Sequence, residues 1–277
     1  MAVTYSQNGT IVRKILPTDA VTTRRIDSEQ GINVVDENGY IGAVVTDYFP
    51  HAENTYFNNF AIVVNNADFS QSGLGQVTFI TPGTADIGGR TYRTVNIGGV
   101  EWLAENLDYK FSGCPIGRSG YTEEPGAWYY NDDETTYGID GTRKCGLLYT
   151  WYAVKLLNDN RATLCPGWHV PTTSEWNTLA TDVGGASIAG TILKAYDVSW
   201  ATSWRGTDDY NFSVLPAGRR RSSFTEVSAS AYMWTANEVN STRAYYCSFS
   251  SGAASVSTTG HEYKKDAYSL RLVRDAT

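Results

Sequence analysis

All eight tryptophans and all four cysteines of this chain lie beyond residue 100. The distribution marks a change of domain, because the first part of the chain must fold without either residue type. A length of 277 residues leaves room for two domains of ordinary size. We therefore predict an N-terminal domain over residues 1–82 and a second domain over residues 86–277, with a hinge in the Thr-Pro-Gly-Thr segment at 81–84.

The N-terminal part alternates β-branched and polar residues between turns rich in Gly, Asn and Asp. This pattern predicts a small all-β domain, which we expect to serve in attachment or oligomerisation. The expected strands are Thr10 to Leu16, Ile32 to Val35, Ile41 to Thr46, Phe60 to Asn65 and Gln76 to Thr81.

The second part combines two helical segments with short strands and long aromatic loops, the pattern of an α+β domain. The expected helices are Gly146 to Leu157 and Thr173 to Val183. The segment Thr172 to Glu175 supplies a hydroxyl that can cap the second helix and an acid for its first turn.

Charge and hydropathy exclude two classes of partner. A net charge of −7 argues against nucleic acid, whose binding needs a basic face. No apolar run approaches the roughly 20 residues of a membrane-spanning helix, so we expect no membrane insertion. The N-terminus has no basic stretch followed by an apolar one, so we expect no signal peptide in this chain.

With three histidines and no Cys-x-x-Cys or His-x-x-x-His pattern, we predict no metal site and no cofactor.

Five blocks of the second part occur in the order of one family pattern. They are Tyr92 to Gly98 leading into Trp102 to Leu107, Gly146 to Trp151, Cys165 to Pro171 with Glu175 and Trp176, Gly206 to Ser213 with Leu215 to Gly218, and Tyr268 to Asp275. Over about residues 86–275, the chain resembles the Fibrobacter succinogenes major paralogous domain. The resemblance implies a C-type-lectin-like domain of the formylglycine-generating-enzyme-like subtype, preceded here by the small all-β domain. The Trp and Leu side chains of the blocks are expected to fill its core.

Three individual features receive a structural interpretation. His169 has no second histidine nearby, so we interpret it as a structural residue rather than a metal ligand. Asp208 and Asp209 can supply paired carboxylates for acid chemistry or calcium, but we favour a turn-capping role. The basic run Arg219 to Arg221 is interpreted as a solvated strand edge that discourages aggregation. Contact with an acidic ligand or a partner subunit is its alternative.

The cysteines argue against the chemistry of the formylglycine-generating enzymes, which use a close cysteine pair. Cys114, Cys145, Cys165 and Cys247 are spaced 31, 20 and 82 residues apart. Family members often carry a cysteine where this chain has Leu272, and there it is expected to bridge to the Cys165 equivalent. Without it, we expect Cys165 to be a small buried thiol. A disulfide between Cys114 and Cys145 remains open.

The stretch from Ser241 to Tyr263 has the composition of a binding surface. Ser, Thr, Ala, Gly and Tyr fill 17 of its 23 positions, which leaves too little apolar surface for a buried β-core. Tyrosine gives a large contact area at low entropy cost, and Ser and Gly give adaptable hydrogen bonding, as in antibody loops. A flexible surface loop is the alternative, but the interleaved aromatic residues favour binding.

The lectin-like group includes the variable proteins of diversity-generating retroelements, in which adenine-directed mutagenesis of AAC-like codons varies a ligand-binding face. Such codons cannot give Trp, Met, Glu, Gln or Lys. The resemblance therefore implies a variable region at about 228–267 in which Met233, Trp234, Glu238, Glu262, Lys264 and Lys265 are fixed. Many candidate positions fall two apart, as on one side of a strand. The candidate ligand-binding positions are Ser228, Ser230, Tyr232, Tyr246, Ser248, Ser250, Ser251, Ala253, Ser257, Thr259, Gly260, His261, Tyr263, Asp266 and Ala267.

These features predict a non-enzymatic ligand- or receptor-binding protein with a diversified surface, of the phage tail-fibre type. We expect it on a virion or at a cell surface, bound to a protein or glycan receptor on a target cell. The resemblance also implies that the chain can form a homotrimer. One alternative is a bacterial cell-surface adhesin of the same family without diversification. A second is a formylglycine-generating-type oxidase.

Overall fold

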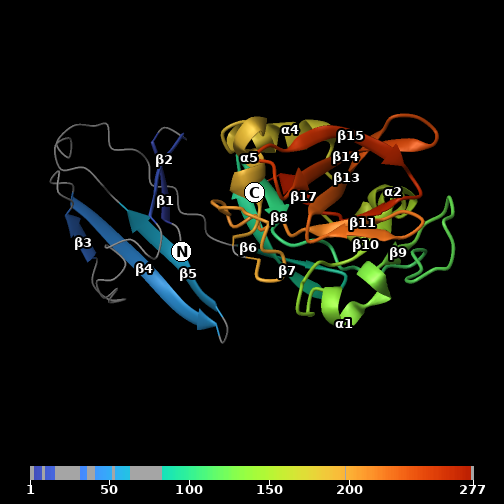
Figure 1. The fold of residues 1–277 in the computed structure, drawn as a ribbon, viewed down its shortest axis with the longest axis horizontal. Helices are drawn as coiled ribbons and strands as arrows, with labels where there is room; N and C mark the ends of the chain where they lie inside the picture. The colour runs from blue at the N-terminus through green and yellow to red at the C-terminus, as the bar shows by residue number, and fades with distance from the viewer. Residues whose placement is uncertain are drawn as a thin grey trace. The chain divides into compact units, whose positions relative to one another are not determined.

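The computed structural model describes residues 83–275 except Asp197, and the backbone of five strands before residue 82. The chain separates into two compact units, Met1–Pro82 and Gly83–Thr277. Strands occur in both units and helices among the described residues of the second, so the chain is of mixed α+β class (Figure 1). Among the described residues, no helix combines the length and apolar character that crossing a membrane requires.

The described strands of the first unit form small antiparallel sheets. β1 pairs with β2, and β3, β4 and β5 form a three-stranded sheet in that order. These strands are β1 (Val3–Gln7), β2 (Thr10–Ile15), β3 (Ile32–Val35), β4 (Ile41–His51) and β5 (Asn54–Ile62). The strands predicted from residues 10, 32 and 41 are confirmed, and the one predicted at 60–65 overlaps the end of β5. The strand predicted at 76–81 lies outside the described residues.

The second unit begins with a strand where the sequence predicted a hinge. β6 (Gly83–Ile87) pairs with β7 (Arg90–Ile97), and Gly83 and Thr84 lie opposite residues of β7 in this ladder. The hinge prediction is therefore wrong for Gly83 and Thr84, because ladder pairing restrains their backbone. With β8 (Val100–Leu103) and β17 (Val273–Asp275), these strands form an antiparallel sheet in the order β17-β8-β7-β6.

Two glycine pairs turn the chain between β6, β7 and β8. Gly88 and Gly89 have φ values of 61° and 80°, and Gly98 and Gly99 have values of 64° and 83°. A two-residue hairpin turn with positive φ at both positions is most readily formed by glycine, which has no Cβ. The Gly-Gly sequence therefore accounts for two tight turns in succession.

A mixed eight-stranded sheet forms the larger layer of the second unit. Its order is β15-β14-β13-β11-β16-β10-β9, and β12 pairs with β11. Its strand pairs are antiparallel except for β11 and β13, which meet in parallel. The strands are β9 (Ala127–Trp128), β10 (Leu148–Thr150), β11 (Ala217–Arg220), β12 (Phe224–Val227), β13 (Ser230–Glu238), β14 (Arg243–Ser250), β15 (Ser257–Tyr263) and β16 (Ala267–Tyr268).

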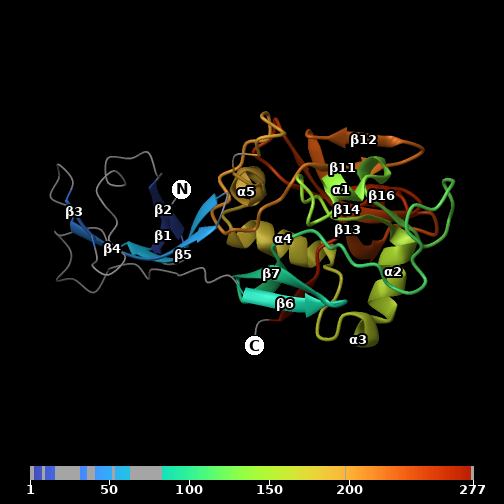
Figure 2. The ribbon, with the colours of Figure 1, turned by 90° about the horizontal axis from the view of Figure 1, so that it is seen from below.

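Helix α4 (Thr173–Asp182) confirms the second predicted helix to within one residue. Thr172 caps it, since its hydroxyl accepts a hydrogen bond from the Glu175 backbone N–H at 3.2 Å. The Glu175 carboxylate accepts one in return from the Thr172 backbone N–H at 2.7 Å, which completes a capping box. The helix packs on β13, β14 and β15 (Figure 2).

The first predicted helix begins later than expected. Leu148 to Thr150 form β10, because they pair with β9 and β16, and helix α2 (Trp151–Asp159) starts only after the Thr150 cap. β10 pairs with strands that are far from it in the sequence, so the local pattern of residues could not predict this pairing. Other helices were not predicted: α1 (Glu134–Tyr137), α3 (Arg161–Leu164), α5 (Ala186–Leu193) and the 3-10 turn η1 (Tyr130–Asp132).

Tryptophan fills the core of the second unit, as the sequence predicted. Trp102, Trp176 and Trp234 are each 1% exposed or less. The Trp234 ring stacks on Tyr268 with centroids 4.3 Å apart, and its Nε1 donates to the Tyr149 carbonyl at 2.9 Å. Burial of these rings accounts for a large part of the apolar surface that the unit removes from water.

A buried arginine joins segments that lie far apart in the chain. The Arg271 guanidinium lies 4.3 Å from the Phe212 ring centre and donates to the Phe212 carbonyl. It also donates to the carbonyls of Ser213 at 2.9 Å and Leu103 at 3.3 Å. Its Nε donates to the Asn106 side-chain oxygen at 3.2 Å. These bonds satisfy a charge that burial would otherwise make costly.

We predict that R271M lowers the free energy of unfolding by about 3 kcal/mol or more, because buried carbonyls lose their donor. Urea unfolding measures the loss. R93M is the matched control: the Arg93 side chain is 44% exposed, so this change is expected to cost less than about 1 kcal/mol. Equal losses in the two variants would contradict this role for Arg271.

Candidate functional site

Strands β13, β14 and β15 bring seven of the candidate positions together on one side of the sheet. The register places Ser230 opposite Ser250, and Tyr232 opposite Ser248. Ser248 also lies opposite a β15 residue, as does Tyr246. Paired residues in neighbouring strands point to the same side. We call this surface the tyrosine–serine face; it consists of Ser230, Tyr232, Tyr246, Ser248, Ser250, Ser257 and Gly260, all half-buried or exposed.

The opposite side of β13 and of the last part of β14 is buried. Ala231, Met233, Cys247 and Phe249 alternate with the residues of the face and are at most 1% exposed. The Phe249 ring lies 6.3 Å from the ring of Trp176 on α4. Helix α4 therefore supports the face from behind.

The other candidate positions lie elsewhere. Ser228 precedes β13, Ser251 and Ala253 lie in the turn between β14 and β15, and Thr259 is exposed on β15. His261 and Tyr263 are also exposed, but they pair with residues that alternate with those of the face. By alternation, these two side chains leave the sheet on its opposite side.

Two candidates lie beneath the surface. Asp266 and Ala267 are each 0% exposed. Ala267 belongs to β16, where it pairs with Thr150 of β10 and Arg220 of β11. Asp266 lies in the turn before β16, where it is paired with Arg221 and Tyr121. Fully buried side chains offer no contact to a ligand, so neither residue is part of the binding surface.

Aromatic rings support the two tyrosines of the face. The Tyr232 and Tyr246 ring centres lie 5.5 Å apart, and each lies within 5.2 Å of the Tyr268 ring centre. Tyr246 also meets Trp234 edge-on at 6.3 Å. Trp234 and Tyr268 are fully buried, so the half-buried tyrosines rest on a rigid aromatic layer.

Gly260 lies beneath the ring of Tyr246. A Cβ placed on Gly260 would come within 2.5 Å of that ring. A larger residue at 260 therefore requires the Tyr246 side chain to move. These two candidate positions are physically coupled.

The sequence predicted that the arginine run lies at a solvated strand edge. This prediction is wrong, because β11 lies between β13 and β16 in the sheet. Arg220 is buried and lies 4.0 Å from the Trp128 ring centre. It also donates to the Gly120 carbonyl at 3.0 Å. The strand order that places this run inside the sheet is not readable from local sequence.

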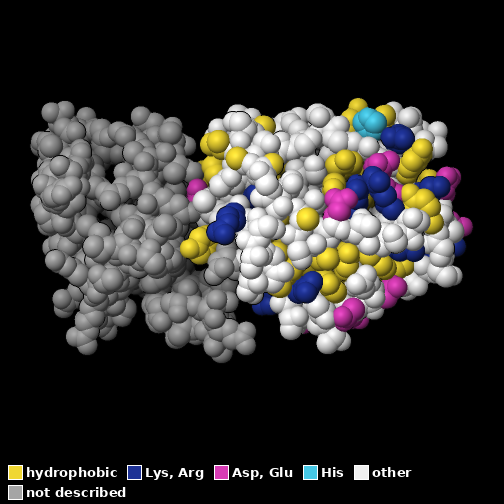
Figure 3. Space-filling model, viewed as in Figure 1, with side chains coloured by type: hydrophobic (Ala, Val, Ile, Leu, Met, Phe, Trp, Pro, Cys, Tyr) yellow, Lys and Arg dark blue, Asp and Glu magenta, His cyan; other side chains and the backbone are white. Residues whose placement is uncertain are grey.

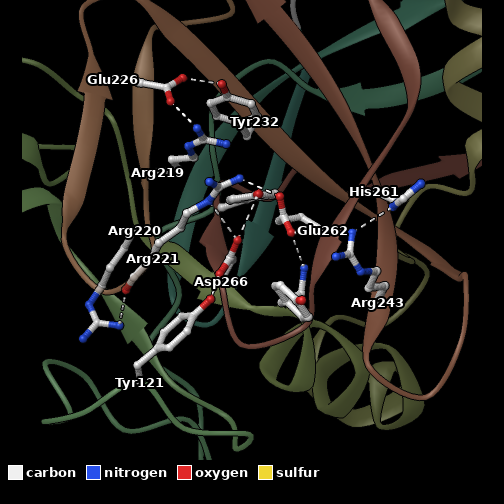
Figure 4. A network of polar contacts seen from close by, with 12 residues as sticks. Tyr121, Arg219, Arg220, Arg221, Glu226, Tyr232, Arg243, His261, Glu262 and Asp266 are labelled. Atoms are coloured by element: carbon white, nitrogen blue, oxygen red, sulfur yellow. Dashed lines mark hydrogen bonds and ion pairs between the residues drawn. The ribbon is translucent and has the colours of Figure 1, made fainter.

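Arg219 joins the edge of the face to β12. Its guanidinium forms an ion pair with Glu226 and lies 4.7 Å from the Tyr232 ring centre, while the Tyr232 hydroxyl donates to Glu226 (Figure 4). Partial burial acts to raise the pKa of the Glu226 carboxyl, but the Tyr232 hydrogen bond and the Arg219 charge outweigh it. The pKa therefore lies below its ordinary value, and Glu226 is an anion at neutral pH.

Arg221 links β11 to the turn that follows β15. It forms ion pairs with Glu262 at 2.6 Å and Asp266 at 3.2 Å, and the Tyr121 hydroxyl donates to the same Asp266 (Figure 4). Figure 3 shows basic and acidic side chains side by side on this part of the surface, with hydrophobic side chains around them. Nothing in the local sequence indicated that Tyr121 would reach this site.

A buried lysine that the sequence did not single out holds the turn beside the face. Lys194 is 1% exposed, and its Nζ donates to the carbonyls of Ser250 and Ala253, each at 2.9 Å. The Nζ also lies 5.1 Å from the Trp204 ring centre. Burial lowers the pKa of Lys194. Because these bonds go to main-chain oxygens, they do not depend on which side chains the turn carries.

Residues 95–274 match the Fibrobacter succinogenes major domain family. The chain belongs to this family. The matched range includes the whole tyrosine–serine face and β17 up to Arg274, and it excludes the first unit. No curated protein matches the chain.

Two features of this Fibrobacter succinogenes major domain have the structural roles that the sequence predicted. His169 Nε2 lies 2.7 Å from a Glu175 carboxylate oxygen in the first turn of α4. Asp208 accepts hydrogen bonds from the Ser213 backbone N–H at 2.7 Å and the Ser213 hydroxyl at 2.6 Å, which caps a turn. In the part of the chain that the structure describes, no three His, Cys, Asp or Glu residues are grouped to hold a metal ion.

The four thiols of the domain are buried and unpaired, including Cys114 and Cys145. Cys165 is 0% exposed, as expected for a small buried thiol. Burial raises the pKa of Cys165 to about 11, and that of Cys114 and Cys145 to about 12. A thiol with such a pKa is almost fully protonated at neutral pH and is a poor nucleophile or metal ligand.

The two sides of β14 should tolerate substitution differently. We predict that S248N changes the free energy of unfolding by less than about 1 kcal/mol, because the side chain lies on the half-open face. C247N, its neighbour on the buried side, should cost about 2 kcal/mol or more, because it buries an amide. Chemical denaturation of both variants measures the difference. A similar cost for the two would contradict the assignment of the sides.

Proposed function

We propose that this chain is a non-enzymatic receptor-binding protein whose tyrosine–serine face contacts the ligand. We further propose that it is a variable protein of a diversity-generating retroelement, of the phage tail-fibre type. One observation carries the proposal: seven candidate positions share one side of a sheet whose other side is buried around Cys247 and Phe249, against α4. Side chains on this face can change while the residues buried on the other side keep their packing.

The positions proposed as fixed include residues that hold the scaffold. Met233 and Trp234 are buried in β13. Lys264 is 4% exposed and pairs with Glu238 at 2.8 Å. Its ammonium also lies 4.6 Å from the Trp151 ring centre. Variation at these positions would remove packing or ion pairs, whereas variation on the face would change the surface that a ligand meets.

The proposed subtype of the fold is C-type-lectin-like. The support is the closure of the second unit: its last strand, β17, pairs with β8 in the sheet that also holds its first strand, β6. The segment from β13 to β15 lies in the eight-stranded sheet, whereas the first and last strands of the unit, β6 and β17, lie in the four-stranded sheet. Such an arrangement keeps a binding segment apart from the chain termini.

The non-enzymatic proposal is supported by the thiols. An oxidase of the formylglycine-generating type needs a pair of reactive cysteines, and thiolates are the reactive form. Burial raises the pKa of Cys114, Cys145, Cys165 and Cys247, which favours the neutral thiol at each position.

The proposed partner is a protein or glycan receptor on a target cell, with the chain on a virion or a cell surface. A homotrimer would present three copies of the face, and multivalent binding raises the overall affinity of weak single contacts. Tyr232 and Tyr246 on the face, with Arg219 at its edge, suit protein contacts in particular, since tyrosine and arginine are enriched in interfaces.

The proposal predicts that the face accepts new binding specificities. In a display library, Tyr232, Tyr246, Ser248 and Ser250 are randomised among Asn, Ser, Tyr, Asp, Thr and Gly, and the library is selected against a purified test protein. We expect binders whose affinity falls at least tenfold when the selected residues revert. The variants should remain folded, with a lower unfolding temperature where a selected residue replaces Tyr232 or Tyr246, because these rings pack on Trp234 and Tyr268.

A matched library controls for general surface tolerance. It randomises four exposed helical positions among the same amino acids: Lys155, Asp159, Thr178 and Thr181. We expect no binders from it. Equal numbers of binders from the two libraries would contradict a specialised role for the face.

A further inference from the structure

The segment that carries the face differs in charge from the rest of the chain. Residues 217–268 contain six Lys and Arg and four Asp and Glu, a net charge of +2, whereas the whole chain carries −7. An excess of basic residues within an acidic protein favours an anionic ligand at this location. The contacts of each basic residue show where such a ligand can bind.

Most of these basic groups are already engaged by the protein. Arg219 and Arg221 form ion pairs with carboxylates. Arg220 is buried on Trp128, and Lys264 is buried and paired with Glu238. Arg243 and Lys265 remain.

Arg243 and Lys265 flank one exposed tyrosine. The Arg243 guanidinium lies 4.4 Å from the Tyr263 ring centre, and the Lys265 ammonium lies 5.7 Å from it. Lys265 also lies 4.6 Å from the Tyr121 ring centre and has no carboxylate partner among the described residues. The Tyr263 ring is 43% exposed and the Arg243 side chain 32%, so both are open to solvent.

The nearest carboxylates do not neutralise this pair. Glu262 lies 3.8 Å from Arg243 but only 2.6 Å from Arg221, and Asp266 is buried against Arg221 and Tyr121. Arg221, Arg243 and Lys265 therefore outnumber Glu262 and Asp266, which leaves one positive charge in excess beside the Tyr263 ring. His261 Nδ1 lies 3.5 Å from an Arg243 nitrogen and extends the polar surface.

We propose that Arg243 and Lys265, both beside Tyr263, form a carboxylate-binding anchor for an acidic peptide segment of the receptor. Arginine and lysine bind carboxylates through charge-assisted hydrogen bonds, and the tyrosine ring adds apolar contact. The anchor rests on the proposed function, because it would hold the same receptor at the edge strand β15, where Tyr263 leaves the sheet on the side opposite the tyrosine–serine face. Neither cation is a candidate variable position, so the two charges stay constant while Tyr263, which is a candidate position, can vary.

The free edge of β15 favours a peptide over a glycan. β15 is the last strand of the sheet, and the Lys264 N–H donates to the Thr242 carbonyl at 2.9 Å. In the observed register, alternate residues bond to β14, and the main-chain groups of His261 face outward. Those of Tyr263 are engaged locally, since its carbonyl accepts from the Asp266 N–H at 2.9 Å and its N–H donates to the Glu262 carboxylate at 3.2 Å. An extended peptide can pair with the edge at His261 through its own main-chain N–H and C=O, whereas a glycan has no such pair of groups.

The test uses the full chain and a hexaglutamate peptide, with hexaglutamine as the uncharged control and oligogalacturonate as the glycan probe. Isothermal titration at low salt measures the affinity. We expect hexaglutamate to bind, hexaglutamine and oligogalacturonate to bind at least tenfold more weakly, and R243Q/K265Q to lose at least tenfold in affinity for hexaglutamate. R243K/K265R should retain most of the affinity.

K110Q/K155Q is the matched control, since it removes two exposed positive charges far from β15 in the sequence. It should retain the affinity of the parent. Circular dichroism checks that each variant is folded. The proposal is overturned if hexaglutamate does not bind, if K110Q/K155Q loses as much affinity as R243Q/K265Q, or if oligogalacturonate binds as well as hexaglutamate. If hexaglutamate does not bind but the face library yields binders, the anchor is wrong and the proposed function stands.

Discussion

Helix α4 covers one side of β13, β14 and β15, and the contact of Trp176 with Phe249 belongs to this cover. Side chains alternate along a strand. Covering one side of the sheet therefore divides the residues of each strand into two classes, those that face the helix and those that face away from it. Cys247 and Phe249 must be small or apolar enough to pack, while Ser248 between them faces outward. The tyrosine–serine face can therefore differ in composition from a core while sharing its backbone.

Main-chain contacts preserve that backbone independently of the face. Lys194 holds the carbonyls of Ser250 and Ala253, and the Thr191 backbone N–H donates to the Ala254 carbonyl at 2.9 Å. The contacts use oxygen atoms that every amino acid carries. A surface with variable side chains needs supports of this kind, because contacts made by its own side chains would change with each variant.

Local patterns predicted the elements whose causes are local. The cap at Thr172, the helix that follows it and the turn at Asp208 depend on residues a few positions apart. The strand periodicity likewise identified seven positions of the face. Burial of Ala267 depends instead on β16 lying between β10 and β11, and burial of Asp266 on its contacts with Arg221 and Tyr121, none of which alternation within one strand reveals.

The central claim concerns natural variation on the face, so the most direct measurement is deep sequencing of codons 228–267 in the source population. The account predicts substitutions that arise from adenine changes, concentrated at the tyrosine–serine face, with codons for buried residues such as Trp234, Cys247 and Phe249 unchanged. A uniform segment, or variation spread equally over buried and exposed positions, would contradict a diversified receptor-binding face.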